Sequence, residues 1–437
     1  MSEQQSTTGD AALAVVIRVL GAGLVFGLQV LLARLLPEDG YGGFVTLWTW
    51  MLALGSFAAL GFAESSVRFL PRYQVRSRHE ALGGYWRFGL KTVCGAGLGV
   101  LLLAAALAFW LGLDGPNLTV VLILLGLPIL GLEYYLEGVA RSFGWFRLAA
   151  VPVYILRPIL IGLVCLGLTA AGVDLTLPVV GGVLIGSMGV VVLLMWLLLA
   201  RRLRSFRSGR GPVTRGQGRL WLAASLPLLV LSGLDDLVGY ADVLVLSLLS
   251  EPEIVAVYFA AARALALAGF VAYAMTLVAG RQFAVSHASA DRAQLQRGIL
   301  QSTRLTLWAT VVSVVLALAA SPLLLRAFGE AYLAGQPVML VLGLGMIVRA
   351  MAGQAGEVLI VLGRQRQGLI VGLGILLIMA VLGVLLVPVL GGLGAAIASA
   401  TAMVCRTAAL SLLLWRTERL QVFSLGLPTF ASASVRA

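Results

Sequence analysis

The stretch LARLLPEDGYG, residues 32–42, separates two long apolar runs at 11–36 and 41–67. Its proline, its adjacent carboxylates and its glycines are typical of a tight connection between helices. Each flanking run exceeds the roughly 20 residues that an α-helix needs to cross the hydrocarbon core of a bilayer. The stretch therefore predicts two membrane-spanning helices joined by a short acidic turn.

The composition of the whole chain excludes a soluble protein. Hydrophobic residues make up 60% of the 437 residues and charged residues 11%, against about 45–50% and about 25% in soluble domains. Long apolar runs recur from end to end, which predicts an all-α membrane protein with about twelve transmembrane helices. The predicted spans are 11–36, 41–67, 84–112, 117–140, 148–171, 176–200, 218–249, 254–281, 298–327, 337–361, 367–389 and 391–415.

The connections between these spans alternate between acidic and basic. Of the 31 basic residues, 24 follow even-numbered spans or end the chain, two lie in the other turns, and five lie inside spans. The positive-inside rule then places both termini in the cytoplasm of a multi-pass protein of the plasma (inner) membrane. The basic loop 201–219 is more typical of a topology determinant beside anionic lipid than of a nucleic-acid site, so no nucleic-acid partner is expected.

The residue types exclude several other kinds of site. Lys91, the only lysine, follows Leu90 rather than a glycine, so the chain has no phosphate-binding ATPase loop. The cysteines lie far apart in apolar segments and the histidines in polar loops, so no disulfide set, metal site or cofactor is expected. These residues are Cys94, Cys165, Cys405, His79 and His287. The first ten residues carry no basic segment, so the first apolar run is expected to be a retained helix rather than a signal peptide.

The second half of the chain resembles the first. The stretch LLSEPEIVAVY at 248–258 joins the seventh and eighth spans as residues 32–42 join the first and second. Six spans per repeat give both halves the same orientation, as in transporters built from two bundles around a central cleft. The predicted organisation is an N-terminal six-helix bundle at 1–200, a cytoplasmic linker at 201–217 and a C-terminal six-helix bundle at 218–437.

Four stretches resemble the signatures of a known family: 32–42, LGFAESSVRFLP at 60–71, ADVLVL at 241–246, and 253–263. They are similar to matching helices in the two halves of polysaccharide-lipid flippases (Wzx-like proteins) of the multidrug/oligosaccharidyl-lipid/polysaccharide exporter superfamily. The resemblance implies a flippase and not an enzyme. Its cargo would be a polyprenyl-diphosphate-linked oligosaccharide, moved from the cytoplasmic to the outer leaflet by alternating access for lipopolysaccharide or exopolysaccharide synthesis. Membrane lipids, a polysaccharide polymerase and other assembly proteins are the further expected partners.

Five arginines lie inside the predicted spans, where a charged residue costs about 2.5–3.5 kcal/mol and usually faces a cavity or a partner. A guanidinium group stays protonated and binds a diphosphate through paired hydrogen bonds, so these side chains fit an anionic cargo. A structural pairing would satisfy Arg406. The family resemblance implies that Arg18 and Arg263 line a cationic cavity, because related flippases carry arginines on their first and eighth helices. The predicted substrate-binding residues are Arg18, Gln29, Arg157, Arg263 and Arg349, with Gln29 on the same face of the first span as Arg18.

Some acidic residues inside the spans have a basic residue at helical spacing. Glu64 is expected to pair with Arg68 one turn later, and Glu133 and Glu137 with Arg141. The spacing of that second group recurs in the tenth span at Arg349, Gly353 and Glu357.

The seventh span carries three acids with no basic neighbour on their own helix. Such acids either meet arginines of the cleft or titrate, and titration would couple transport to protons or cations. The candidate ion-coupling residues are therefore Asp235, Asp236, Asp242 and Glu64.

Three other functions fit the sequence less well than a flippase does. A cation- or proton-coupled drug antiporter of the same superfamily would favour an acid-lined cleft without arginines. A membrane polysaccharide polymerase or acyltransferase would need a large outer loop or a clustered His/Asp/Glu site, which the short outer turns do not provide. A scaffold without transport leaves the deep charges unexplained.

Overall fold

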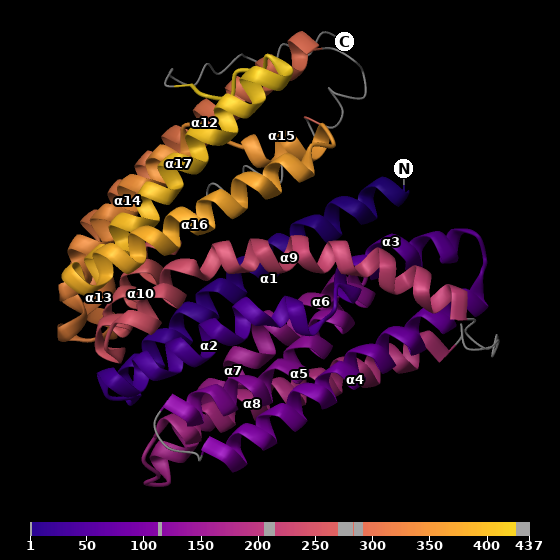
Figure 1. Cartoon of the computed structure of the whole chain (residues 1–437), viewed down its shortest axis with the longest axis horizontal. Helices are drawn as coiled ribbons and strands as arrows, with labels where there is room; N and C mark the ends of the chain where they lie inside the picture. Colours follow the sequence, from indigo (N-terminus) through magenta and orange to yellow (C-terminus); the bar gives the residue numbers. More distant parts are fainter. Residues whose placement is uncertain (1, 112–115, 205–214, 270–282, 284–291, 425–437) are drawn as a thin grey trace. The chain divides into compact units, whose positions relative to one another are not determined.

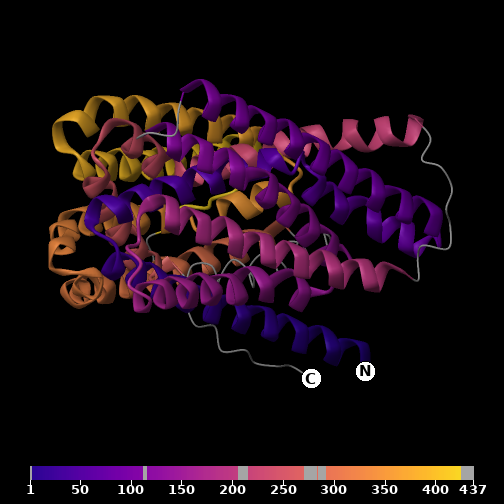
Figure 2. The ribbon, with the colours of Figure 1, turned by 90° about the horizontal axis from the view of Figure 1, so that it is seen from below.

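The computed structural model describes residues 2–111, 116–204, 215–269, 283 and 292–424, and it divides into two compact units. Unit 1 is Met1–Tyr240 and unit 2 is Ala241–Ala437. All regular elements of the described residues are helices (Figures 1 and 2). The predicted all-α class is confirmed.

Unit 1 is built around α5, which packs against α2, α3, α4 and α8. A single π-helical turn, η1, interrupts the fifth predicted span between α6 and α7. The elements are α1 (Ser2–Leu35), α2 (Glu38–Ala58), α3 (Phe62–Val75), α4 (His79–Leu111), α5 (Pro116–Ser142), α6 (Phe146–Val151), η1 (Pro152–Leu156), α7 (Arg157–Ala170), α8 (Leu177–Arg202) and the first part of α9 (Arg215–Leu249).

In unit 2, α17 packs against both α14 and α16, and α14 packs against α12. After the second part of α9, the elements are α10 (Pro252–Ala266), α12 (Arg292–Ala319), α13 (Ser321–Phe328), the 3₁₀ turn η3 (Glu330–Gly335), α14 (Gln336–Ala350), α15 (Ala355–Val361), α16 (Gln365–Leu390) and α17 (Gly392–Glu418).

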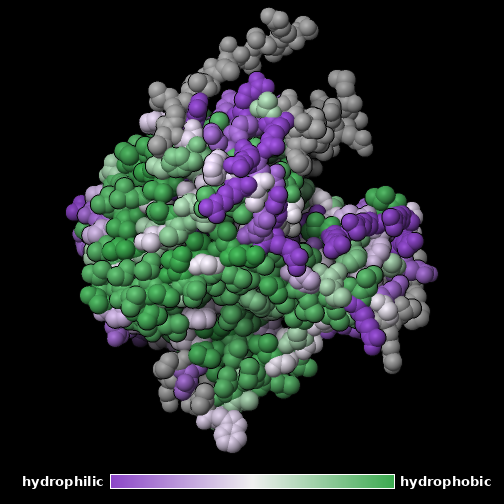
Figure 3. Space-filling model, turned by 45° about the horizontal axis from the view of Figure 1, so that its top comes forward, coloured by the Kyte–Doolittle hydropathy of each residue, from purple (hydrophilic) through white to green (hydrophobic). Residues whose placement is uncertain are grey.

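The described part of each of the twelve predicted spans contains a helix, and residues 270–281 of the eighth span lie outside the described residues. Among the described residues, nine helices are long and apolar enough to cross a membrane, or ten if the bent pair α2 and α3 forms one span. Exposed leucines and valines recur along the long helices of both units, and Figure 3 shows apolar side chains over most of the visible surface. Exposure of so much apolar surface to water is unfavourable, which indicates that this surface contacts lipid.

Two predicted spans are broken at glycines. The second span bends by 42° between α2 and α3, where Gly61 has φ +71°. The tenth span is interrupted between α14 and α15, where Gly353 has φ +51°. The recurring spacing of Arg349, Gly353 and Glu357 therefore does not align these residues on one helix, because α14 ends at Ala350.

The first part of α9 packs on unit 1 through buried polar contacts. The Ser225 hydroxyl donates to Ser65 Oγ at 2.7 Å, and Ser65 lies 2.6 Å from the Tyr85 hydroxyl. Trp221 Nε1 donates to the Tyr73 hydroxyl at 2.9 Å. The boundary between the compact units therefore falls inside α9, whereas the sequence placed all of 218–437 in one bundle. The assignment of two six-helix bundles stays a prediction, and 205–214 of its linker lie outside the described residues.

The contact at Gly61 gives a test of this packing. A Cβ on Gly61 would lie 2.2 Å from the carbonyl oxygen of Ser225, whereas Gly144, with the same φ of +71°, has open space around it. We expect Gly144→Ala to lower the free energy of unfolding by about 1 kcal/mol, from backbone conformation alone. Gly61→Ala should cost about 3 kcal/mol or more, because α9 must also move. Thermal unfolding of the purified protein, followed by tryptophan fluorescence, measures the difference; equal losses would argue against the contact.

Candidate functional site

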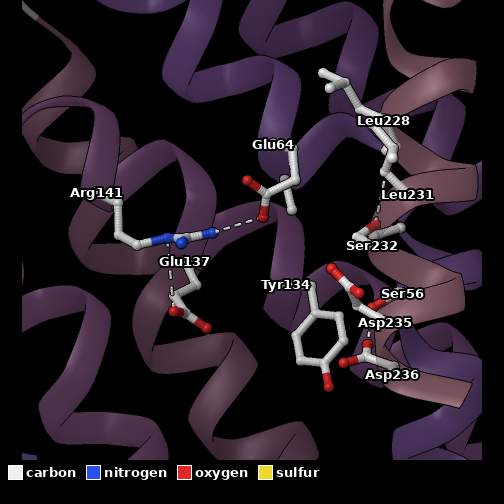
Figure 4. A pocket seen from close by; sticks show the side chains of 13 residues that line it. Ser56, Glu64, Tyr134, Glu137, Arg141, Leu228, Leu231, Ser232, Asp235 and Asp236 are labelled. Atoms are coloured by element: carbon white, nitrogen blue, oxygen red, sulfur yellow. Dashed lines mark hydrogen bonds and ion pairs between the residues drawn. The ribbon is translucent and has the colours of Figure 1, made fainter. Parts of the chain in front are cut away.

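A polar cavity of about 450 Å³ lies within unit 1, lined by residues of α2, α3, α5 and α9 (Figure 4). Four carboxylates line it together with a single guanidinium group. The cavity therefore has an excess of negative charge. The charged lining residues are Glu64, Glu137, Arg141, Asp235 and Asp236.

Arg141 neutralises one side of the cavity. Its Nη2 lies 3.2 Å from Glu64 Oε1, and its Nε lies 3.6 Å from Glu137 Oε1. The predicted pair of Glu137 and Arg141 is confirmed. The predicted pair of Glu64 with Arg68 is wrong, because the Glu64 side chain points across the cavity to α5 (Figure 4).

The α9 side of the cavity has no basic residue among the described lining residues. Asp236 accepts a hydrogen bond from the Ser56 hydroxyl of α2. Asp235 is exposed to the cavity. Three of the four candidate ion-coupling residues, Glu64, Asp235 and Asp236, therefore converge on one cavity from two helices far apart in the sequence.

Arg157 forms a buried ion pair directly after η1. Its Nη1 lies 2.8 Å from Glu133 Oε1, with side chains 11% and 0% exposed respectively. Its guanidinium also lies 5.0 Å from the centre of the Trp48 ring. The predicted pairing of Glu133 with Arg141 is therefore wrong. Glu133 lies one turn deeper in α5 than Glu137, at the level where α7 begins.

Arg18 and Gln29, predicted on one face of the first span, have different surroundings. Arg18 is exposed, with its guanidinium 5.8 Å from the centre of the Tyr154 ring in η1. Gln29 is buried and accepts a hydrogen bond from the Tyr41 hydroxyl at 3.0 Å. The structure does not bring these two side chains together.

Unit 2 contains a counterpart of the Gln29 contact. The buried Tyr258 hydroxyl donates to Asp242 Oδ2 at 2.7 Å, and Tyr258 occupies the place in the second repeat that Tyr41 occupies in the first. Arg263 lies within electrostatic reach of Asp242, and its guanidinium lies 4.5 Å from the centre of the Phe259 ring. Asp242 is not among the described residues that line the cavity of unit 1.

Two arginines of unit 2 lie near each other where α14 and α17 pack closely. A Cβ on Gly345 would lie 3.0 Å from Ala400 Cα and 3.1 Å from Met403 Sδ. Arg349 follows Gly345 by one turn, and Arg406 follows Met403 by almost one turn. They interact electrostatically, and among the described residues no carboxylate forms an ion pair with either of them.

The structure adds site residues that the sequence reasoning missed. Arg141, Ser56, Tyr134 and Ser232 line the cavity of unit 1, and Arg406 lies beside Arg349. Arg141 carried a signal, since it follows Glu137 at helical spacing, and Arg406 is one of the five arginines inside the predicted spans. No local pattern distinguished Ser56, Tyr134 or Ser232.

Metal ligands do not cluster in the part of the chain that the structure describes. No group of three or more His, Cys, Asp or Glu side chains is placed to hold a metal ion there. The expectation that the protein works without a metal or cofactor stays a prediction.

Comparison with known proteins adds a family and a fold. A profile of the family described as "polysaccharide biosynthesis protein" matches residues 9–280, which is more than half of the chain. A search by sequence finds no match among curated proteins.

Solved structures of transporters match nearly the whole chain. An inward-facing multidrug resistance MATE family transporter of the MOP superfamily matches with TM-score 0.74 and 15% identity, over 93% of this chain and 98% of its own. Lipid II flippase MurJ in an inward closed conformation matches with TM-score 0.71 and 16% identity, over 92% and 87%. An outward-facing MATE structure matches with TM-score 0.62 and 15% identity, over 93% and 95%. At these identities the likeness establishes the fold. The resemblance predicted from the sequence is confirmed: the chain is a multi-pass membrane protein of the polysaccharide biosynthesis protein family with the fold of MOP-superfamily transporters.

Proposed function

We propose that the protein is a flippase that moves a polyprenyl-diphosphate-linked oligosaccharide from the cytoplasmic to the outer leaflet by alternating access. The observation that carries the proposal is the neighbouring pair Arg349 and Arg406 in unit 2. The family match to polysaccharide biosynthesis supports a glycan cargo, and one structural relative is named a lipid II flippase. The lipid anchor and the diphosphate are the chemical features that such a cargo adds to the glycan.

Two guanidinium groups near each other inside a membrane protein require a counter-charge. Each costs about 2.5–3.5 kcal/mol to insert on translocon scales, and like charges add repulsion. Arg349 is exposed and Arg406 half-buried, so an anion can reach them. A diphosphate supplies two negative charges and several acceptor oxygens, which guanidinium groups bind in bidentate fashion.

The other predicted substrate-binding residues have different roles in this proposal. Arg18 and Arg263 lie against the aromatic rings of Tyr154 and Phe259, and in the proposal their guanidinium groups, which have several N–H donors each, also donate to cargo oxygens. Gln29 and Arg157 already bind Tyr41 and Glu133. Either of these two residues would have to exchange partners to contact the cargo.

The acidic cavity of unit 1 supports coupling to a proton or a monovalent cation. Asp235 and Asp236 carry negative charge with no basic neighbour among the described cavity residues, and Glu64 shares Arg141 with Glu137. A cation that binds here would be neutralised by these carboxylates. We assign Asp242 to the same role in unit 2 with less exposure, because Tyr258 already donates to it.

The same cavity makes a drug antiporter the second candidate. Its acidic lining would suit a cationic drug, and several relatives of the same fold are MATE transporters. The arginine pair in unit 2 argues against this candidate, because a drug cation would be repelled there. A membrane polymerase or acyltransferase gains no support from the family or from the fold.

The proposal places the protein in the plasma (inner) membrane with both termini in the cytoplasm. This orientation follows from the basic loops. Membrane lipids, a polysaccharide polymerase and other assembly proteins are the proposed partners, and nucleic acid is not.

Flipping by the reconstituted protein tests the proposed function. The assay scores outer-leaflet accessibility of a fluorescent lipid-linked oligosaccharide in proteoliposomes. We expect Arg349→Ala or Arg406→Ala to lower the rate about tenfold or more, since a charge-assisted hydrogen bond contributes about 1.5–3 kcal/mol. Arg416→Ala removes an exposed arginine at the end of α17 and should leave the rate unchanged. Normal flipping by a variant with both Arg263 and Arg349 replaced by Ala would refute the assigned site.

The charge of the cavity in unit 1 can be probed by cysteine chemistry. In a variant without the native cysteines, Ser232→Cys places a thiol in the cavity lining. At low salt we expect a cationic methanethiosulfonate reagent to react about tenfold faster than an anionic one, relative to their rates with a free thiol, because the carboxylates attract cations. Ser225→Cys, at a fully buried position on the same helix, should not react. Equal rates of the two reagents at position 232 would contradict an acidic, water-accessible cavity.

A further inference from the structure

The ion pair between Glu133 and Arg157 is the most buried of those that the structure describes. The side chains of Glu133 and Arg157 are 0% and 11% exposed, whereas Arg141 and Glu64 at the cavity are 38% and 43% exposed. Burial of this kind makes each charge depend on its partner, because water cannot replace it.

The Glu133 carboxylate is only half satisfied. Its Oε1 accepts from Arg157 Nη1 at 2.8 Å, but its Oε2 is buried and has no hydrogen-bond partner in the part of the chain that the structure describes. A buried carboxylate that lost Arg157 would be an uncompensated charge, which a proton on Oε2 would remove. Glu133 is therefore the place in unit 1 where a proton and a guanidinium group are alternative ways to neutralise one charge.

The groups around Glu133 leave Arg157 as its dominant positive neighbour. On α5 itself the ionisable neighbours are Tyr134 and, one turn later, Glu137. From α2, residues 42–58 carry no ionisable side chain, and neither do residues 177–200 of α8. Two other arginines interact with neighbours of Glu133. Arg18 interacts electrostatically with Glu137 and Tyr154, and Arg141 forms an ion pair with Glu137.

The remaining acids interact electrostatically with neighbours of Glu133. Glu64 of α3 acts on Glu137. Asp236 of α9 acts on Tyr134, which in turn interacts electrostatically with both Glu133 and Arg157. Tyr134 also lines the acidic cavity. Tyr134 therefore interacts electrostatically with a carboxylate of the cavity, Asp236, and with both members of the buried ion pair.

The π turn before Arg157 offers the helix two orientations of the side chains that follow it. The π turn η1 ends at Leu156, directly before Arg157. A π turn holds one more residue than an α turn, so its conversion to an α turn would rotate the following side chains by about 100° around the helix axis. Such a rotation would take Arg157 away from Glu133 without unfolding α7.

We propose that Glu133 is a proton-binding site linked to anion binding at Arg157. A proton taken from water through the acidic cavity neutralises Glu133, and Arg157, which keeps its charge, becomes free to bind the phosphate groups of the cargo. The linkage is reciprocal: an anion on Arg157 favours the protonated form of Glu133 by the same factor. The nature of the anion rests on the proposed function, whereas the proton site does not.

Calorimetry with inorganic diphosphate tests the linkage. The full-length protein in phosphatidylcholine nanodiscs is titrated in two buffers of different ionisation enthalpy, which gives the number of protons taken up per diphosphate bound. We expect the wild type to take up about one proton more than Glu133→Gln, and its affinity to rise by up to about tenfold per unit fall in pH. Glu133→Gln should show only the pH dependence of diphosphate itself. Glu330→Gln removes an exposed acid that also pairs with an arginine and should behave as the wild type. Equal proton uptake by the wild type and Glu133→Gln would overturn the linkage.

Infrared difference spectroscopy without any diphosphate tests the proton site separately. Acidification should produce a carbonyl band of a buried, protonated carboxyl group in the wild type and in Glu330→Gln that is missing from Glu133→Gln, in which only the bands of the other acids remain. If Glu133→Gln does not fold, Glu133→Asp keeps the acid and should shift the band. A spectrum of Glu133→Gln with no band lost relative to the wild type, or a spectrum of Glu133→Asp with no band shifted, would overturn the assignment. A band at Glu133 in a protein that binds no diphosphate would leave the proton site standing and count against the proposed function.

Discussion

A charged side chain within a membrane-spanning bundle needs a partner, and this constraint accounts for the polar architecture of both units. Lipid offers no hydrogen bonds, so each such charge is neutralised by protein, by a ligand or by a water-filled cavity. In unit 1 the arginines meet carboxylates: Arg141 meets Glu64 and Glu137, and Arg157 meets Glu133. In unit 2 the neighbouring Arg349 and Arg406 have no such partner among the described residues. This pair therefore differs from Arg141 and Arg157 of unit 1, which carboxylates of the protein neutralise.

The two predicted repeats share one buried contact but differ in its charge. A tyrosine of the second helix in each repeat binds a polar residue of the preceding helix: Tyr41 binds Gln29, and Tyr258 binds Asp242. The neutral amide in the first half and the acid in the second show that the contact is conserved in form while its charge has changed. The charge of the transported molecule therefore depends on the side chains at these positions and not on the shared fold.

Local signals made the fold predictable, whereas long-range packing determined the site. Apolar runs and acidic turns are readable from neighbouring residues, and helices lie in all twelve predicted spans. Helical spacing correctly predicted the pair of Glu137 and Arg141. Glu64 and Glu133 instead bind arginines that lie 77 and 24 residues away in the sequence. Gly61, at the bend between α2 and α3, lies close to the backbone of Ser225 on α9, a helix far along the chain. Such choices depend on which helix faces which, and a single sequence does not encode that in any local pattern.

The acidic cavity lies in unit 1 and the pair Arg349 and Arg406 in unit 2. This distribution of charge has an energetic consequence for export of a diphosphate. A dianion bound between Arg349 and Arg406 is neutral as a complex, so the loaded protein moves little net charge when access changes. The empty protein returns with two uncompensated positive charges. A membrane potential that is negative inside draws such charges toward the cytoplasmic face, with about 2.3 kcal/mol for each full charge moved through 100 mV. Under the proposed function, the potential therefore acts on the return step.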